Sequence, residues 1–235
     1  MAHGDAGTLI LVGASQEHAQ PLIETINDKF HKVKVLFITA DSGQLATVRG
    51  AAETIQRLDI PIDGIVACPA LMAGPWETTA DGIESHFQVN YLAHFLLVNL
   101  LLASMSEGAT AVLVSTSIGP EARAPRYDDI GFSVSQCIKD PFRALKVQLI
   151  QLGSAADSVG WRIIHIIMQD GRIYDPLDAY AQSMFANIQF PKCLANACAG
   201  RSLTAFSVNP GSELMAAFPF PSLSLPPLRL LQWES

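Results

Sequence analysis

Short apolar runs alternate with stretches of helical periodicity along the first half of the chain. Buried strands are predicted at the apolar runs 8–15, 33–39, 64–70 and 110–115. Helices are predicted in the intervals between them, at 17–30, 43–58 and 83–105. Strands that alternate with helices in this way predict an α/β fold with a Rossmann-like, doubly wound parallel sheet.

The stretch 61–117 contains the candidate site. Its two strands are joined by the long helix 83–105, which is apolar on nearly all sides and therefore predicted to be buried on more than one face. The second strand ends in three hydroxyl side chains, Ser115, Thr116 and Ser117. Ligands of doubly wound sheets bind beyond the carboxyl ends of the strands, so we expect a small-molecule site there.

The amino-acid composition indicates which classes of protein the chain can belong to. With 235 residues, 49% of them hydrophobic and 16% charged, the chain can form one globular domain with a large core. The net charge of −7 argues against a nucleic-acid partner. The four cysteines show neither metal-ligand spacing nor a disulfide framework, so we predict no metal site and a reduced protein. Cys68 is expected to be a small buried apolar residue.

No membrane segment or secretory signal is predicted. The first residues lack a basic start and an apolar core. The most apolar run, 91–102, is too short to span a bilayer and carries His94 and Asn99. A cytoplasmic location is the resulting expectation.

Several motifs resemble those of the short-chain dehydrogenase/reductase family, especially its retinol-dehydrogenase-like branch of fungal type. They are Ile62-Asp63, Val89-Asn90-Tyr91-Leu92, His94-Phe95, Val114-Ser115-Thr116-Ser117, DAYAQSMFANIQF at 178–190 and LTAFSVNPG at 203–211. The resemblance covers most of the chain between Thr8 and Gly211. It implies an oxidoreductase that interconverts a carbonyl and an alcohol on a small secondary metabolite, with NADP or NAD as cofactor.

The resemblance also implies catalytic residues. Tyr180 matches the family's catalytic tyrosine, Thr116 or Ser117 its carbonyl-aligning hydroxyl, and Asn90 the helix asparagine that holds a water of the proton relay. The family places a lysine four residues after the tyrosine, on the same helix face. Here that residue is Met184, whose thioether cannot stabilise a tyrosinate or hydrogen-bond a nicotinamide ribose.

The N-terminal strand admits two alignments with the family. Gly13-Ala14-Ser15 could be the remains of the glycine-rich cofactor loop after the first strand, but Glu17 would then place a carboxylate beside phosphate. Alternatively, 8–15 is the family's second strand, and the first βα unit with its loop is lacking. The spacing to Ala67 favours the second alignment, since only one further strand and one helix intervene.

The remaining cofactor-binding residues implied by the family are altered or ambiguous. Asp41 matches an adenine-contacting aspartate, although Asp41 and Ser42 could equally cap the helix 43–58. The family's Asn-Asn-Ala-Gly is Ala67-Cys68-Pro69-Ala70 here. Implied cofactor contacts are thus Asp41, Ala67, Asn90, Tyr180, Pro210 and Gly211.

Two stretches depart from the family altogether. The block 134–169 separates two segments that adjoin each other in the family, and it begins Val-Ser and ends Met-Gln, as translation of a retained intron would. The hypothesis of a retained intron or gene-model error competes with a genuine inserted subdomain that has a helix at 142–152 and a strand at 161–167. The tail 216–235 is apolar but broken by prolines, which prevents a central last strand and predicts extended packing.

Two functions follow from these observations. The first is a single-domain oxidoreductase of the family, impaired by the loss of the glycine loop and the lysine. The second is a non-catalytic binding or partner protein, or an enzyme that uses Tyr180 without a cofactor. Under both, a homo-oligomer formed through the helix 83–105 is plausible.

Overall fold

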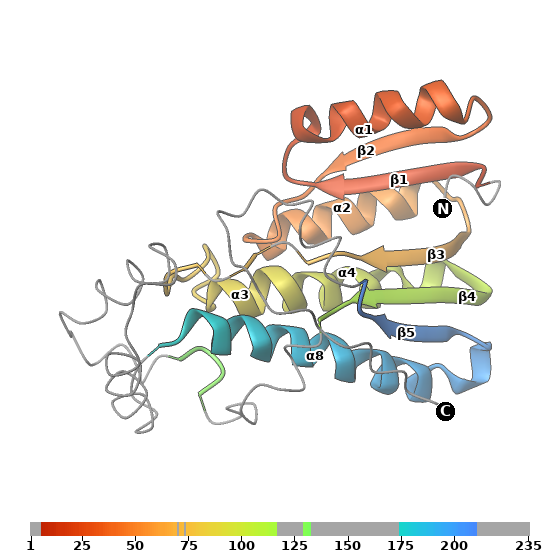
Figure 1. Ribbon diagram of the computed structural model, residues 1–235. Coiled ribbons are helices and arrows are strands. Elements are labelled where there is room, and N and C mark those ends of the chain that lie inside the picture. Colours follow the sequence, from red (N-terminus) through yellow and green to blue (C-terminus); the bar gives the residue numbers. More distant parts are fainter. Residues whose placement is uncertain (1–5, 70, 73, 117–128, 133–173, 211–235) are drawn as a thin grey trace.

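A computed structural model of the chain describes residues 6–69, 71–72, 74–116, 129–132 and 174–210 (Figure 1). The predicted α/β alternation is confirmed. The strands are β1 Thr8–Gly13, β2 Lys34–Thr39, β3 Ile62–Ala67, β4 Met105–Val114 and β5 Thr204–Val208. The main helices are α1 Gln16–Lys29, α2 Leu45–Arg57, α4 Ala93–Leu101 and α8 Pro176–Ala197.

The long predicted helix is one stretch of 20 residues, Ser85–Ser104, with three local geometries. It runs through α3 Ser85–Phe87, a π-helical turn η2 Gln88–Leu92, α4, and a closing 3-10 turn η3 Leu102–Ser104. The π-helical turn surrounds Asn90, and such turns are frequent at functional sites. By length and composition the stretch could cross a membrane, a test that the core helix of a soluble protein also passes. Here it packs against α2 and α8.

The parallel strands form two separate hydrogen-bonded sheets. β1 pairs with β2, and β3, β4 and β5 pair in that order. No described strand lies between β1 and β3, so each has a hydrogen-bonded neighbour on one side only within this part of the chain (Figure 1). The usual dinucleotide-binding order is 3-2-1-4-5-6. The observed order corresponds to it with the first strand left out, which fits the alignment of β1 with the family's second strand.

A helical layer joins the two sheets. Ala52 and Ile55 of α2 and Leu101 of α4 form a buried cluster. Ile10 and Ile38 from the first sheet and Ile62 and Ile65 from the second pack against that cluster. The two sheets therefore share a hydrophobic core through α2 and α4, although no described hydrogen bond links their strands.

The described residues on either side of 133–173 meet in space. The rings of Phe132 and Tyr174 are in edge-to-face contact, with centroids 5.5 Å apart. Both belong to a small core with Ala179 and partly buried Trp76. The indole of Trp76 donates a hydrogen bond to the carbonyl of Gly131, 3.0 Å away. The described residues that flank 133–173 therefore lie next to each other. The block 134–169 and the tail 216–235 themselves lie outside the described residues.

We predict that the block 134–169 can be excised. Joining Ser133 to Asp170 leaves five residues between Phe132 and Tyr174, a reach of about 20 Å, which is ample for two rings in contact. The shortened chain should fold, and its far-ultraviolet circular dichroism should show that the described helices and strands are kept. Its free energy of unfolding in urea should be equal or higher, because a shorter loop costs less entropy, by about 2 kcal/mol at most.

A matched control removes the same number of residues from the C-terminal side, 200–235, which takes away β5 and should abolish folding. If the variant without 134–169 also fails to fold, the block belongs to the domain and the insertion hypothesis is wrong. Finding codons 134–169 in the dominant spliced transcript would separately exclude a retained intron.

Candidate active site

Tyr180 lies in the second turn of α8. The carboxylate of Asp175 caps this helix by accepting from the Leu177 amide at 2.9 Å, and Pro176 occupies the first helical position, where no amide donor is needed. Tyr180 is buried, and burial raises the pKa of its phenol above the ordinary value. A raised pKa keeps the phenol protonated at neutral pH, so it can donate a proton but cannot serve as a base.

Met184 lies one turn after Tyr180 on the same face of α8, at the position where the family resemblance implies a lysine. Its side chain is buried, with 2% exposure. Its backbone carbonyl accepts a hydrogen bond from the hydroxyl of Ser115, 2.9 Å away at the end of β4. This bond joins α8 to β4 directly. This hydrogen bond holds the helix against the sheet.

The structure describes two of the three hydroxyl side chains predicted at the end of β4. The hydroxyl of Ser115 donates to the backbone carbonyl of Met184 in α8, as described above. Thr116 follows it and is buried, with 8% exposure. Ser117 lies outside the described residues. The choice between Thr116 and Ser117 as the carbonyl-aligning group stays a prediction.

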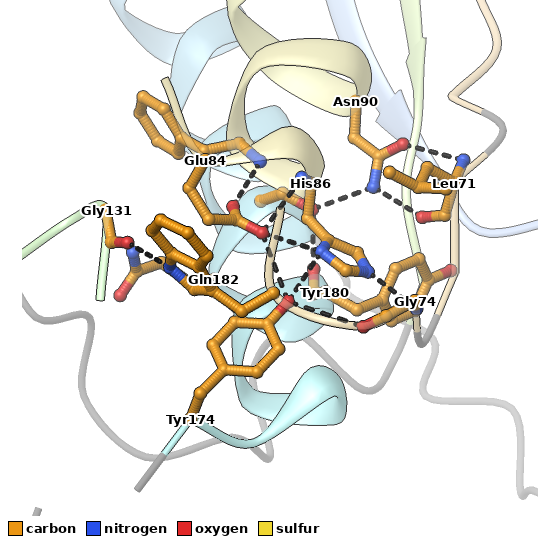
Figure 2. A network of polar contacts seen from close by, with 12 residues as sticks. Leu71, Gly74, Glu84, His86, Asn90, Gly131, Tyr174, Tyr180 and Gln182 are labelled. Atoms are coloured by element: carbon orange, nitrogen blue, oxygen red, sulfur yellow. Dashed lines mark hydrogen bonds and ion pairs between the residues drawn. The ribbon is translucent and has the colours of Figure 1, made fainter. Parts of the chain in front are cut away.

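Asn90 connects three parts of the site (Figure 2). Its side-chain oxygen accepts from the Leu71 amide at 2.9 Å, and its amide group donates to the Leu71 carbonyl at 2.7 Å and to the Ser183 hydroxyl at 3.0 Å. Ser183 in turn donates to the carbonyl of Tyr180. Asn90 thus fixes the loop after β3 and the turn that carries Tyr180. Its role in a water relay is not tested by these contacts and stays a prediction.

The backbone carbonyl of Asn90 also accepts hydrogen bonds from side chains. It accepts from the side-chain amide of Asn187 and lies 3.0 Å from Nδ1 of His94. Burial lowers the pKa of His94, so its imidazole is neutral at neutral pH and Nδ1 is the donor. The polar contact of half-buried His94 is therefore satisfied within its own helix.

A second polar cluster, not predicted from sequence, lies beside Tyr180 (Figure 2). Its members are Glu84, His86 and Tyr174, which are 2%, 0% and 6% exposed. Oε1 of Glu84 lies 2.7 Å from Nδ1 of His86, and the Tyr174 hydroxyl is within 3.2 Å of both side chains. Nε2 of His86 accepts from the Gly74 amide at 3.1 Å. Since Nε2 is an acceptor, His86 is the neutral tautomer with its proton on Nδ1.

Glu84 is ionised in this cluster. Its burial opposes the charge, but the hydrogen bond from His86 and those from the backbone amides of His86 and Phe87 outweigh burial and lower the pKa of the carboxyl. Those two amides belong to the first turn of α3, so Glu84 also caps the helix. The sequence signal for the cap was an acidic residue directly before the helix start at Ser85. The contact with Tyr174, 90 residues away, had no local signal.

The cluster fixes the same loop that Asn90 fixes. Asn90 holds Leu71, and His86 holds Gly74. The loop lies just beyond the carboxyl end of β3, where the family's Asn-Asn-Ala-Gly would contact the cofactor. Its first residues, Ala67, Cys68 and Pro69, are described, and Ala70 is not. None of these three has a polar side chain that could replace the missing amides.

Cys68 is exposed, so the prediction that it is buried was wrong. It follows Val66 by two residues and therefore shares the exposed face of β3. Neighbouring atoms still desolvate the thiol and raise its pKa. A thiol with a raised pKa is a poor nucleophile at neutral pH, and a catalytic role for Cys68 is not supported.

Asp41 closes the turn before α2. Its carboxylate accepts from the Gly43 amide at 2.8 Å and from the side chain of Gln44 at 3.1 Å. The prediction that Asp41 and Ser42 cap a helix beginning at Gly43 is corrected in one respect: α2 begins at Leu45, and Asp81 accepts from the Leu45 amide at 2.8 Å. A contact of Asp41 with adenine stays a prediction.

The last implied cofactor residues lie after β5. Pro210 is exposed two residues beyond the end of the strand, and Gly211 lies outside the described residues. In the described part of the chain, no three His, Cys, Asp or Glu side chains are grouped so that they could hold a metal ion.

Comparison with known proteins decides the family. The sequence profile of the family described as short chain dehydrogenase matches residues 1–126. The chain belongs to the short chain dehydrogenase family. Its Rossmann-like fold, with parallel strands and flanking helices, is that of the family.

Curated relatives are oxidoreductases of the same kind. The human WW domain-containing oxidoreductase is 28% identical over 88% of this chain and 43% of its own length. The human polyprenol dehydrogenase is 27% identical over 86% of this chain and 52% of its length. An oxidoreductase of Fusarium equiseti, fscI, is 26% identical over 88% and 77%. The chain thus spans about half the length of the first two.

Solved structures support the fold. A protein from Mycobacterium paratuberculosis superposes with a TM-score of 0.58 at 21% identity, over 94% of this chain and 78% of that one. A blue fluorescent protein from a metagenomic library, in complex with NADPH, gives 0.56 at 21% identity, over 89% and 66%. These identities establish the fold alone.

We predict that Asn90→Leu destabilises the protein by about 2–4 kcal/mol, because it leaves two buried backbone groups of Leu71 and the hydroxyl of Ser183 without their partner. The matched control is Asn99→Leu on the same helix. Asn99 is exposed and bonds only to the Phe95 carbonyl, so its loss should change stability by less than about 0.5 kcal/mol. Urea unfolding measures both. Equal effects of the two substitutions would contradict the anchoring role of Asn90.

We predict that Met184→Lys lowers the pKa of Tyr180, because an ammonium one helical turn away favours the tyrosinate. The titration is followed by absorbance near 295 nm, as the difference between each variant and the same variant with Tyr180→Phe. Met184→Leu is the control and should leave the pKa unchanged. A folded Met184→Lys protein with an unaltered Tyr180 pKa would show that the side chain at this position does not reach the phenol.

Proposed function

We propose that this protein is a short-chain dehydrogenase-type oxidoreductase for carbonyl and alcohol interconversion on a small secondary metabolite, and that its nicotinamide chemistry is strongly impaired in this chain. The observation that carries the proposal is that Tyr180, the candidate catalytic tyrosine, has buried Met184 one helical turn later, where the family resemblance implies a lysine. The tyrosine supports the family chemistry, and the missing cation supports the impairment.

Tyr180 suits one direction of the reaction. Its phenol is protonated at neutral pH, because burial raises its pKa, and a protonated phenol can donate to the oxygen of a carbonyl substrate. Alcohol oxidation needs the tyrosinate, which has no nearby cation to stabilise it in the described structure. The site therefore favours carbonyl reduction over alcohol oxidation.

The described residues do not fit a nicotinamide dinucleotide well. A pyrophosphate is normally held by the glycine loop after the first strand, at the N-terminus of the following helix. The turn after β1 supplies Ser15 and Glu17 instead, and Ser15 already caps α1 by accepting from the His18 amide. The order of the strands agrees with an alignment in which the first βα unit is lacking. We therefore derive no reaction step through the cofactor.

The names of relatives support the class of substrate and cofactor. One is a polyprenol dehydrogenase, and another is the Fusarium oxidoreductase fscI. Two similar structures contain NADPH, one of them an L-sorbose reductase with its sugar. On these grounds NADP is proposed ahead of NAD for the ancestral reaction. The retinol-dehydrogenase-like branch and a cytoplasmic location are part of the same proposal.

A second function is favoured by the two separate sheets. A chain without the central strand and its phosphate loop would serve as a non-catalytic binding or partner protein, or would use Tyr180 as an acid without a cofactor. In either case association of two copies through Ser85–Ser104 is proposed. Phe87, Tyr91 and Phe95 are half-buried along this helix, and the ring of Tyr91 contacts the other two.

Cofactor binding tests the proposed impairment. We expect NADPH and NADH to bind the purified chain with Kd values above about 1 mM, equivalent to less than about 4 kcal/mol of binding free energy. Isothermal calorimetry measures this directly, with Tyr180→Phe as a control that should bind no differently. A Kd in the micromolar range would mean that the phosphate site is rebuilt from other residues, and the impairment would be refuted.

A further inference from the structure

Glu84, His86 and Tyr174 form a buried polar cluster that the proposed chemistry of Tyr180 does not use (Figure 2). Glu84 lies directly before α3, His86 lies within α3, and Tyr174 lies just before the start of α8. Ionisable side chains are costly to bury unless their hydrogen bonds are satisfied. The hydrogen bonds of this cluster therefore determine which of its groups can take up or release a proton.

The carboxylate of Glu84 has four hydrogen-bond donors around it. Oε1 lies 3.0 Å from the amide nitrogen of His86, 2.7 Å from Nδ1 of its ring and 3.2 Å from the hydroxyl of Tyr174. Oε2 accepts from the amide of Phe87 at 2.8 Å. Among the described residues, no lysine or arginine forms an ion pair with this carboxylate. The cluster therefore carries one buried negative charge while His86 is neutral.

Nε2 of His86 is the ring nitrogen that can take up a further proton. Nδ1 already carries a proton, which it donates to Glu84, whereas the lone pair of Nε2 accepts from the amide of Gly74 at 3.1 Å. A proton and the Gly74 amide therefore compete for the same lone pair. Once protonated, Nε2 is itself a donor, and its hydrogen bond with the Gly74 amide is lost.

The charges around His86 decide this competition. The carboxylate of Glu84 favours an imidazolium, because the two charges would neutralise each other, while burial of the ring and the bond to Gly74 oppose it. Tyr174 is the other described titratable side chain that contacts His86. The phenol of Tyr180 is uncharged, because burial raises its pKa. Histidine ordinarily changes its charge between about pH 5 and 8, so mild acid is the relevant condition.

Gly74 links the cluster to the loop that follows β3. Its carbonyl lies 3.5 Å from the hydroxyl of Tyr174, and a Cβ added to it would lie 3.7 Å from the ring of His86, so its backbone packs directly on the cluster. Leu71 is held separately, by two hydrogen bonds to the side chain of Asn90. Protonation of His86 therefore releases the loop at Gly74, while Leu71 stays bound to a side chain that does not titrate.

We propose that Glu84, His86 and Tyr174 form an acid-sensitive latch on Gly74. The latch is closed while His86 is neutral and holds the backbone of Gly74 against α3. Uptake of one proton at Nε2 forms an ion pair with Glu84 and opens the latch. The open state binds one more proton than the closed state, so a fall in pH favours opening. The loop that is released lies beyond the carboxyl end of β3, where ligands of doubly wound sheets bind.

Amide hydrogen exchange in the full-length protein, resolved by nuclear magnetic resonance, tests the latch. The protection factor of Gly74, corrected for the intrinsic pH dependence of exchange, should fall about tenfold or more between about pH 7.5 and 5.5, because uptake of one proton changes the opening equilibrium up to tenfold per pH unit. Leu71 is the internal control, and its protection should change less than about twofold. Nitrogen-15 signals of the His86 ring should report protonation of Nε2 over the same range.

Substitution of His86 separates the latch from a purely structural cluster. The side-chain oxygen of His86→Gln can accept from the Gly74 amide but takes up no proton, so the protection of Gly74 should vary less than about twofold over the same range. Glu84→Gln removes the charge that favours the imidazolium, so the loss of protection should begin at a lower pH. His94→Gln is the matched control on the same helical stretch and should leave the pH dependence of Gly74 unchanged.

Three results would overturn the latch. Gly74 could stay protected while the nitrogen-15 signals show a protonated His86. His86 could remain neutral in the folded protein at about pH 5.5, below the range in which histidine ordinarily becomes charged. Gly74 and Leu71 could lose protection together, which would mean that acid opens the whole domain. Each result is obtained with the unsubstituted protein, so the test holds even where His86→Gln does not fold. None depends on cofactor binding, so the latch and the proposed function can fail separately.

Discussion

Packing between α2 and α4 is the interaction on which the rest of the structure depends. In a continuous doubly wound sheet, central strands are connected by hydrogen bonds on both edges. In the described part of this chain, β1 and β3 lack such a connection to each other. The buried cluster of Ala52, Ile55 and Leu101 connects the two sheets instead, through the packing of side chains. Side-chain packing can therefore keep the two sheets together where backbone pairing is absent.

The residues that hold Tyr180 all belong to the part of the molecule around the second sheet. Tyr180 is held by contacts within the second sheet and its helices: Ser115 bonds to α8, and Asn90 and Ser183 fix the turn around Tyr180. These contacts do not involve the region between β1 and β3. A phosphate site would have to be built in that region. The contacts that hold Tyr180 therefore do not depend on a strand between β1 and β3.

Local patterns predicted the elements well, because strand and helix periodicity depends on residues close in sequence. The strands around 64–70 and 110–115, and the helix that contains Asn90, were recovered in this way. Residues that act over long distances were harder to predict. Glu84 and Tyr174 are 90 residues apart, and Asp81 caps a helix that begins 36 residues earlier. Cys68 was assigned to the core because its neighbours are apolar, but the face on which it lies has no described cover.

The central claim is that, within the described part of the chain, β1 and β3 each pair with another strand on one edge only. Residue-resolved hydrogen exchange measured by nuclear magnetic resonance tests it most directly. In β4, which is paired on both sides, successive amides should all be protected. In β1 and β3, every second amide should exchange fast, because successive amides of a strand point to opposite edges and one of those edges is free in the described structure. Uniform protection along both strands would reveal a strand between them and contradict the account.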